Sequence, residues 1–146
     1  MNPFRRLREQ GIIGMNERNA RYIQVHNPRS RYPLVDDKLR SKALAEAAGI
    51  AVPRLIGVIE ANRQARQLER ILQGETDFVI KPANGSGGNG IMVFRGRVGP
   101  YYRLSNGALL SLDDIGHHIA NILSGMYSLR GLPDKAMIEE RVQFDP

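Results

Sequence analysis

The chain of 146 residues carries 21 Lys and Arg against 15 Asp and Glu, for a formal net charge of +6, and it has no cysteine. Disulfides and thiolate metal sites are therefore excluded, and a composition of 42% hydrophobic and 25% charged residues is typical of a globular domain. No run approaches the roughly 20 apolar residues of a membrane span, and no signal-peptide pattern follows Met1. We expect a cytoplasmic protein without a membrane partner.

The positive charge is concentrated in the first third of the chain. Residues 1–54 hold eleven Lys and Arg against five Asp and Glu, whereas residues 55–146 hold ten of each. A basic stretch of this kind is compatible with nucleic-acid binding, which stays open as an alternative. It lacks interleaved aromatic residues and a known nucleic-acid module, so an anionic substrate or a plain basic surface is favoured.

The first 33 residues read as a basic lead-in. Its short helix is predicted over 16–25, with Asn16 as N-cap, and Asn27-Pro28 ends it. A helix–strand–helix subdomain is predicted over 34–75. The first helix of this subdomain is expected to have Asp36 as its N-cap and to end at Gly49 and Pro53. A strand over 54–60 and a helix over 61–73 follow. The apolar face of the first helix is expected to comprise Leu39, Ala43, Leu44 and Ala47.

The most informative segment is DFVIKPANGSGGNGIMVF, residues 77–94. It predicts a strand ending in Lys81, a loop with four glycines and a second strand. Backbone N–H groups of a glycine loop can approach an anion closely, and the lysine adds a positive charge suited to phosphate. The segment therefore predicts a nucleoside triphosphate site.

Three better-known phosphate motifs fit this segment poorly. Gly85, Gly87 and Gly90 satisfy G-x-G-x-x-G, but the apolar run that follows favours a strand where a dinucleotide fold needs a helix. Ile91 stands where a P-loop needs Lys followed by Ser or Thr. Protein kinases place their lysine on the strand after the loop, not before it.

The remaining elements are strands at 101–104 and 109–110 around Asn106-Gly107, a helix to about residue 123, and a final strand over 136–142. Ser111 and Asp114 resemble a capping box for that helix. The adjacent His117 and His118 point about 100° apart on a helix and cannot share one metal ion well. We expect one of them to be buried and the other exposed.

The order of lysine and glycine loop resembles the ATP-grasp superfamily. Residues 36–53, with an Asp-Lys start and a Gly-Ile-x-x-Pro exit, are similar to that family's first helix, and residues 136–142 (AMIEERV) are similar to its adenine-binding hinge. More narrowly, the segments GIIGMNERN, NPRSRYPLVDDK and HHIANILSG look like the alpha-L-glutamate ligase-related proteins, which overlap the sugar-transfer-associated ATP-grasp group. The resemblance covers nearly the whole chain.

The resemblance implies a role for each candidate site residue. Lys38 reaches the α-phosphate, and Lys81 contacts the adenine side and a phosphate. The loop covers the β- and γ-phosphates, Glu139 accepts the adenine amino group, and the backbone at Glu140 and Val142 binds the ring edge. Asp145 is a poor candidate for the ribose-binding acid. The loop residues are Gly85, Ser86, Gly87, Gly88 and Gly90.

We therefore expect an α+β, ATP-grasp fold whose C-terminal metal-binding half is absent. Residues 76–146 form the ATP-binding subdomain, cut at the hinge strand, and the Mg²⁺ ligands lie beyond residue 146. The implied activity is that of an ATP-dependent carboxylate–amine ligase acting through an acylphosphate, with ATP, a carboxylate and an amine as partners. This chain alone is expected to be inactive, and a non-catalytic nucleotide-binding or regulatory module is the alternative.

Overall fold

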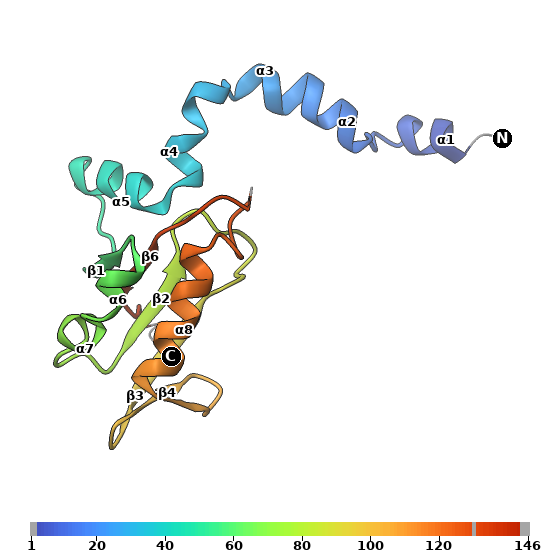
Figure 1. The fold of residues 1–146 in the computed structure, drawn as a ribbon. Helices are drawn as coiled ribbons and strands as arrows, with labels where there is room; N and C mark the ends of the chain where they lie inside the picture. The colour runs from blue at the N-terminus through green and yellow to red at the C-terminus, as the bar shows by residue number, and fades with distance from the viewer. Residues whose placement is uncertain (1–2, 130, 144–146) are drawn as a thin grey trace. The chain divides into compact units, whose positions relative to one another are not determined.

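The computed structural model describes residues 3–129 and 131–143 as helices, strands and connecting loops (Figure 1). The chain divides into two compact units, Met1–Val35 and Asp36–Pro146. Within the described residues, no helix is long and apolar enough to cross a lipid bilayer.

The first unit is helical, and none of its described residues is buried. It contains α1 (Pro3–Glu9), α2 (Met15–Arg18), the π-helical segment η1 (Asn19–Ile23), α3 (Gln24–His26) and the 3₁₀ turn η2 (Arg29–Arg31), and α4 (Pro33–Asp36) ends at its boundary. Segments α2, η1 and α3 form the helix expected at 16–25. The expected cap was wrong, because Gly14 precedes the first helical residue and no side chain caps it.

The second unit opens with α5 (Lys38–Ala47). Its N-cap is Asp37, not Asp36 as predicted from the sequence, because the Asp37 carboxylate accepts the backbone N–H of Leu39 at 2.9 Å while Asp36 ends α4. The predicted apolar face of α5 is also wrong. Leu44 is 52% exposed, and the buried residue of this helix is Lys42.

The helices and strands that follow form one sheet with helices packed on it. They are β1 (Leu55–Ile59), α6 (Asn62–Ala65), α7 (Leu68–Ile71), β2 (Phe78–Pro82), β3 (Met92–Val98), β4 (Tyr101–Leu104), β5 (Leu109–Leu110), α8 (Leu112–Leu123) and β6 (Ala136–Glu140). The helix expected over 61–73 is thus two short helices. The strand ends agree with the predictions within a few residues, and the capping box of Ser111 and Asp114 is present at the start of α8.

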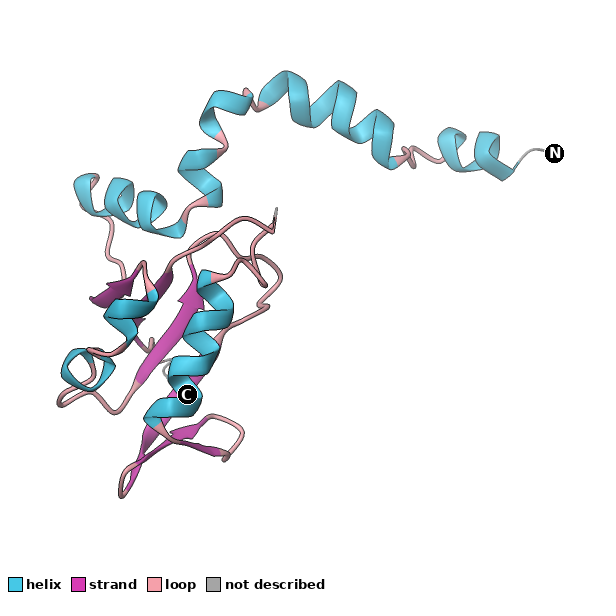
Figure 2. Cartoon of the chain, viewed as in Figure 1, coloured by secondary structure: helices cyan, strands magenta, loops and turns pink. Residues whose placement is uncertain are grey.

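The six strands form one sheet in the order β1-β6-β2-β3-β4-β5, and each strand runs antiparallel to its neighbours. Helices α6, α7 and α8 lie on one face of the sheet (Figure 2). The core lies between them, where Ile115, Ile119 and Ile122 of α8 pack against strand residues such as Phe78, Phe94 and Ile138. Mixed helices and antiparallel strands make this an α+β fold, as expected.

Candidate functional site

The side chains of β2 and β6 divide into two sets because successive residues of a strand point to opposite faces. Ile80 and Ile138, which pair across the two strands, face the helices and are fully buried. Lys81 and Glu139 are one residue further along each strand and therefore lie on the opposite face. The register that buries the core thus places a lysine and a glutamate together on the other side of the sheet.

Glu139 is the centre of this polar group. One of its carboxylate oxygens, Oε1, accepts a charge-assisted hydrogen bond from Lys81, and the other, Oε2, lies 3.5 Å from the ammonium of Lys42 on α5. Lys42 also donates to the carbonyl of Pro53, which lies just before β1. The carboxylate therefore holds α5 and two neighbouring strands of the sheet together through its two lysine partners.

Lys38 lies one helical turn before Lys42 and so shares its face of α5. Its backbone N–H donates to the Ala83 carbonyl at 3.0 Å, and its ammonium donates to the carbonyls of Ala83, at 3.3 Å, and Gly85. Burial, and then the neighbouring charge of Lys81, lower the pKa of Lys38 below its usual value of 10.5, whereas Asp134 and Asp37 act in the opposite direction. The first residue of the glycine loop is thereby tied to the start of α5.

These groups line an open cavity of about 320 Å³ between α5 and the sheet. The cavity contains three ammonium groups and one carboxylate, so its charged side chains carry an excess of two positive charges. Such a surplus favours an anionic ligand. Its lining residues are Lys38, Ser41, Lys42, Ala45, Val52, Pro53, Lys81, Met137 and Glu139.

The glycine loop follows Asn84 and has an exposed middle. Ser86, Gly87, Gly88 and Asn89 are exposed, whereas Gly85 and Gly90 at its ends are partly buried. Gly87, Gly88 and Gly90 have φ values of 62°, 77° and 75°, a region that residues with a Cβ rarely adopt. The loop backbone can therefore direct its N–H groups at an anion in a conformation that residues with a Cβ rarely adopt.

The two ends of the loop need glycine for a different reason. A Cβ on Gly85 would lie 2.5 Å from Cγ of Pro82, and one on Gly90 would lie 2.6 Å from the ring of Tyr127. Both distances are far shorter than van der Waals contact. The four glycines expected to cover phosphates thus divide into two that pack tightly at the loop ends and two that lie open between them.

The hinge residues lie at the end of β6. Glu140 donates its backbone N–H to the carbonyl of Arg54 at 3.0 Å, and its carboxylate lies 3.5 Å from the Arg54 guanidinium. Arg141 donates to the Asp77 carboxylate at 2.6 Å, which holds the pKa of Arg141 above its usual value. Val142 follows the strand and is half-exposed, whereas Asp145 lies outside the described residues.

Lys38, Lys81 and Glu139 are thus brought into one cavity, and Gly85 joins them through Lys38. The exposed loop residues, Glu140 and Val142 do not line it. Lys42 was missed by the sequence analysis, although its spacing of four from Lys38 was an available signal. Asp134 is buried and accepts a hydrogen bond from Asn84, and no pattern in the sequence predicts this contact.

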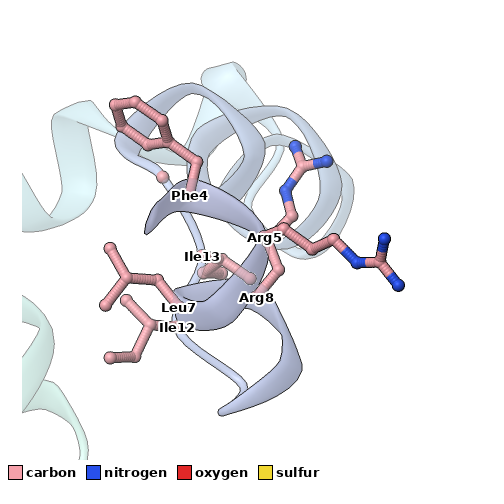
Figure 3. A pocket seen from close by; sticks show the side chains of 7 residues that line it. Phe4, Arg5, Leu7, Arg8, Ile12 and Ile13 are labelled. Atoms are coloured by element: carbon pink, nitrogen blue, oxygen red, sulfur yellow. The ribbon is translucent and has the colours of Figure 1, made fainter. Parts of the chain in front are cut away.

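The two histidines behave as expected, since His118 is buried and His117 is exposed. Among the described residues, no group of three or more His, Cys, Asp and Glu side chains is arranged to hold a metal ion. A separate hollow lies within the first unit (Figure 3), where Phe4, Leu7 and Ile12 point to one side and Arg5 and Arg8 to the other. No carboxylate lines it, and its seven residues carry no hydroxyl or amide side chain.

Comparison with known protein families identifies a match. A family model described as sugar-transfer associated ATP-grasp matches residues 17–146. No curated protein and no solved structure matches the chain. The match includes α5, the glycine loop and β6, and therefore every candidate site residue named above.

Proposed function

The chain belongs to the sugar-transfer associated ATP-grasp family, and from this premise we propose that the cavity between α5 and the sheet binds the phosphates of ATP. The observation that carries the proposal is the presence of Lys38, Lys42 and Lys81 in one cavity with a single carboxylate, beside a glycine loop that Lys38 contacts. The excess of two positive charges in the cavity favours an anion, and the triphosphate of a nucleotide is such an anion.

Each lysine has a distinct part in this proposal. Lys38 and Lys81 are partly exposed residues, and their ammonium groups bind phosphate oxygens directly. Lys42 is buried, so it acts by holding the Glu139 carboxylate. The N–H groups of Gly87 and Gly88 and the hydroxyl of Ser86 cover the β- and γ-phosphates, because this part of the loop is open to a ligand.

The adenine ring lies at the end of β6 in this arrangement. Glu139 accepts the amino group through a carboxylate already oriented by two lysines, and the backbone of Glu140 and Val142 borders the ring. The N–H of Glu140 is already donated to Arg54, so its contribution comes from the carbonyl side. The described residues hold no acidic cluster for Mg²⁺, so none of them is assigned as a metal ligand.

We further propose that this ATP-binding part serves an alpha-L-glutamate ligase-like reaction. The γ-phosphoryl group of ATP passes to a carboxylate and gives an acylphosphate and ADP. An amine then attacks the acyl carbon, releases phosphate and a proton, and leaves an amide. In this reaction Lys38 and Lys81 neutralise phosphate charge and orient the triphosphate, which is most of what a protein contributes to phosphoryl transfer.

Calorimetric titration of the chain with ATP tests the binding proposal. We expect Lys38→Ala and Lys81→Ala to weaken binding by roughly tenfold or more, since each removes a charge-assisted bond of about 1.5–3 kcal/mol. Lys135→Ala is the matched control, because Lys135 is an exposed lysine outside the cavity. Absence of ATP binding by the folded chain, or equal binding by Lys81→Ala, would contradict the proposal.

A second measurement addresses the reaction. Because this chain alone is expected to be inactive, phosphate release from ATP in the presence of Mg²⁺, a carboxylate and an amine is also measured on a longer protein that contains residues 1–146. Turnover by the longer protein and not by residues 1–146 supports the ligase, whereas ATP binding without turnover by either supports the nucleotide-binding or regulatory module.

A further inference from the structure

Both ends of the glycine loop are held by hydrogen bonds to buried side chains. These side chains, Asp134 and His118, have no part in the proposed phosphate binding. At the start of the loop, the buried Asp134 carboxylate accepts the backbone N–H of Asn84 at 3.0 Å and its side-chain amide at 2.8 Å. Asp134 is 5% exposed; its carboxylate also accepts the N–H of Lys135 at 2.7 Å, and its own N–H donates to the Leu123 carbonyl at 3.3 Å. This carboxylate therefore holds both the backbone and the side chain of Asn84, the residue just before the loop.

The far end of the loop is held by α8. Nε2 of His118 lies 2.9 Å from the carbonyl oxygen of Gly90, and since a carbonyl can only accept, Nε2 carries the proton. The ring of Tyr127 packs against the α-carbon of Gly90 and also lies 5.4 Å from the His118 ring, centroid to centroid. His118 is thus a buried polar side chain whose hydrogen bond is directed at the loop.

Backbone contacts also connect the start of the loop to the segment after α8. Gly85 forms an isolated antiparallel bridge with Ser128, and the N–H of Leu129 donates to the Asn84 carbonyl at 3.3 Å. Both ends of the loop thus rest on the segment that follows α8. Only Ser86, Gly87, Gly88 and Asn89 remain exposed between them.

We propose that Asp134 and His118 are positioning residues for the glycine loop, and that their hydrogen bonds restrict its motion to residues 86–89. The proposal rests on the proposed function, because it assigns these residues to the loop that covers the phosphates. A loop with fixed ends loses less conformational entropy when it closes over a ligand, so its preorganisation increases affinity. Removal of either fastening enlarges the mobile segment and weakens ATP binding. His118 is the cleaner test, because replacing Asp134 also takes a negative charge away from Lys38.

The chain offers a direct measurement of loop motion. Because it has no cysteine, Asn89→Cys provides a single attachment site for a nitroxide spin label. We expect the label to become more mobile when His118→Leu removes the hydrogen bond to Gly90. His118→Gln keeps an N–H donor and should restore the parent spectrum, whereas His117→Leu, at the exposed neighbour, should leave it unchanged.

Asp134 is tested in the same way. Asp134→Asn replaces two acceptor oxygens by one and should increase label mobility, with the exposed Asp113→Asn as its control. Without the label, ATP affinity should fall roughly three- to tenfold in His118→Leu, as expected for one lost hydrogen bond. If Asp134→Asn fails to fold, the two His118 variants decide the matter.

The outcomes separate this proposal from the one on which it rests. Unchanged label mobility in His118→Leu overturns the positioning role, even if the parent chain binds ATP. Increased mobility in a chain that does not bind ATP supports the fastening of the loop and contradicts the proposed function. Equal mobility in His118→Gln and His118→Leu also overturns the proposal, because it would make the hydrogen bond irrelevant.

Discussion

Lys42 of α5 and Glu139 of β6 form an ion pair of 3.5 Å in which the side chains are only 7% and 8% exposed. Burying a charge without a partner is costly, so the two side chains depend on each other. Lys81 shares the carboxylate and is more exposed, at 22%. The negative charge of Glu139 therefore stabilises the close approach of the two positive charges of Lys42 and Lys81.

Glu139→Gln is the substitution to which this arrangement should be most sensitive. It leaves Lys42 and Lys81 close together without a counter-charge, and breaking a buried pair from one side costs about 3–5 kcal/mol. We expect a loss of that order in the free energy of unfolding, measured by urea denaturation. Lys42→Met should cost less, because Lys81 still neutralises Glu139.

Glu140→Gln is the matched control for this experiment. Its carboxylate is 46% exposed and pairs with a surface arginine, so its loss should change stability by less than about 1 kcal/mol. If Glu139→Gln unfolds at the same urea concentration as the parent chain, the buried pair does not support the cavity.

The lowered pKa of Lys38 predicts a pH dependence. In the folded chain burial and the charge of Lys81 disfavour the protonated ammonium, whereas in the unfolded chain it keeps its usual pKa of 10.5. Between these two pKa values the unfolded state binds more protons, so the contribution of Lys38 to stability rises as pH increases through the lowered pKa. Below the lowered pKa the ammonium is charged in both states, and its burial cost is present in full.

Ligand binding should show the opposite trend. A bound phosphate favours the charged ammonium, so ATP affinity should fall as pH rises through the lowered pKa of Lys38. Titrations of affinity from about pH 7 to about pH 10 should show this fall beginning earlier in the parent chain than in Lys38→Arg, whose guanidinium stays charged. Superimposable pH curves for the two proteins would show that Lys38 does not contact the anion.

Two glycines of the loop should respond differently to alanine. Gly90→Ala combines a positive φ of 75° with a Cβ only 2.6 Å from the Tyr127 ring, whereas Gly88→Ala meets nothing within 4 Å and bears only the strain of its φ. We expect about 1–2 kcal/mol of strain for Gly88→Ala. Gly90→Ala should lose more, because Tyr127 must also move, and thermal unfolding of both variants measures the difference. Equal melting temperatures would contradict the tight packing at Gly90.

The sequence predicted the strands and α8 well because their signals are local. The capping box of Ser111 and Asp114, the Asn106-Gly107 turn and the apolar residues of β2 and α8 all act within a few residues of each other. It failed for α5, whose predicted apolar face is largely exposed. The orientation of that helix depends on Lys42 meeting Glu139, and a partner almost a hundred residues away cannot be read from helical periodicity.

The candidate site shows the same division. Lys38 and Lys81 could be predicted because each stands beside a recognisable motif. The fastening of the glycine loop could not, because Asp134 and His118 lie far from it in sequence and carry no distinctive pattern. A pair of adjacent histidines indicates little until the fold shows which one is buried and what it contacts.

The separation of the chain into two units predicts that residues 36–146 fold alone. The buried apolar core runs from Ile59 to Ile138 and lies wholly within the second unit, and no described residue of the first unit is buried. A chain beginning at Asp36 should therefore unfold cooperatively near the melting temperature of the full chain, as followed by circular dichroism. It should also retain ATP binding, since every lining residue of the cavity is still present.

The same truncation separates ATP binding from the nucleic-acid alternative. Residues 1–35 carry seven arginines and two glutamates, so their removal takes away most of the net positive charge. If the basic segment binds RNA, the truncated chain should lose an affinity that falls steeply with salt, because phosphate contacts release counterions. Loss of ATP binding by a truncated chain that still unfolds cooperatively would mean that the first unit contributes to the nucleotide site.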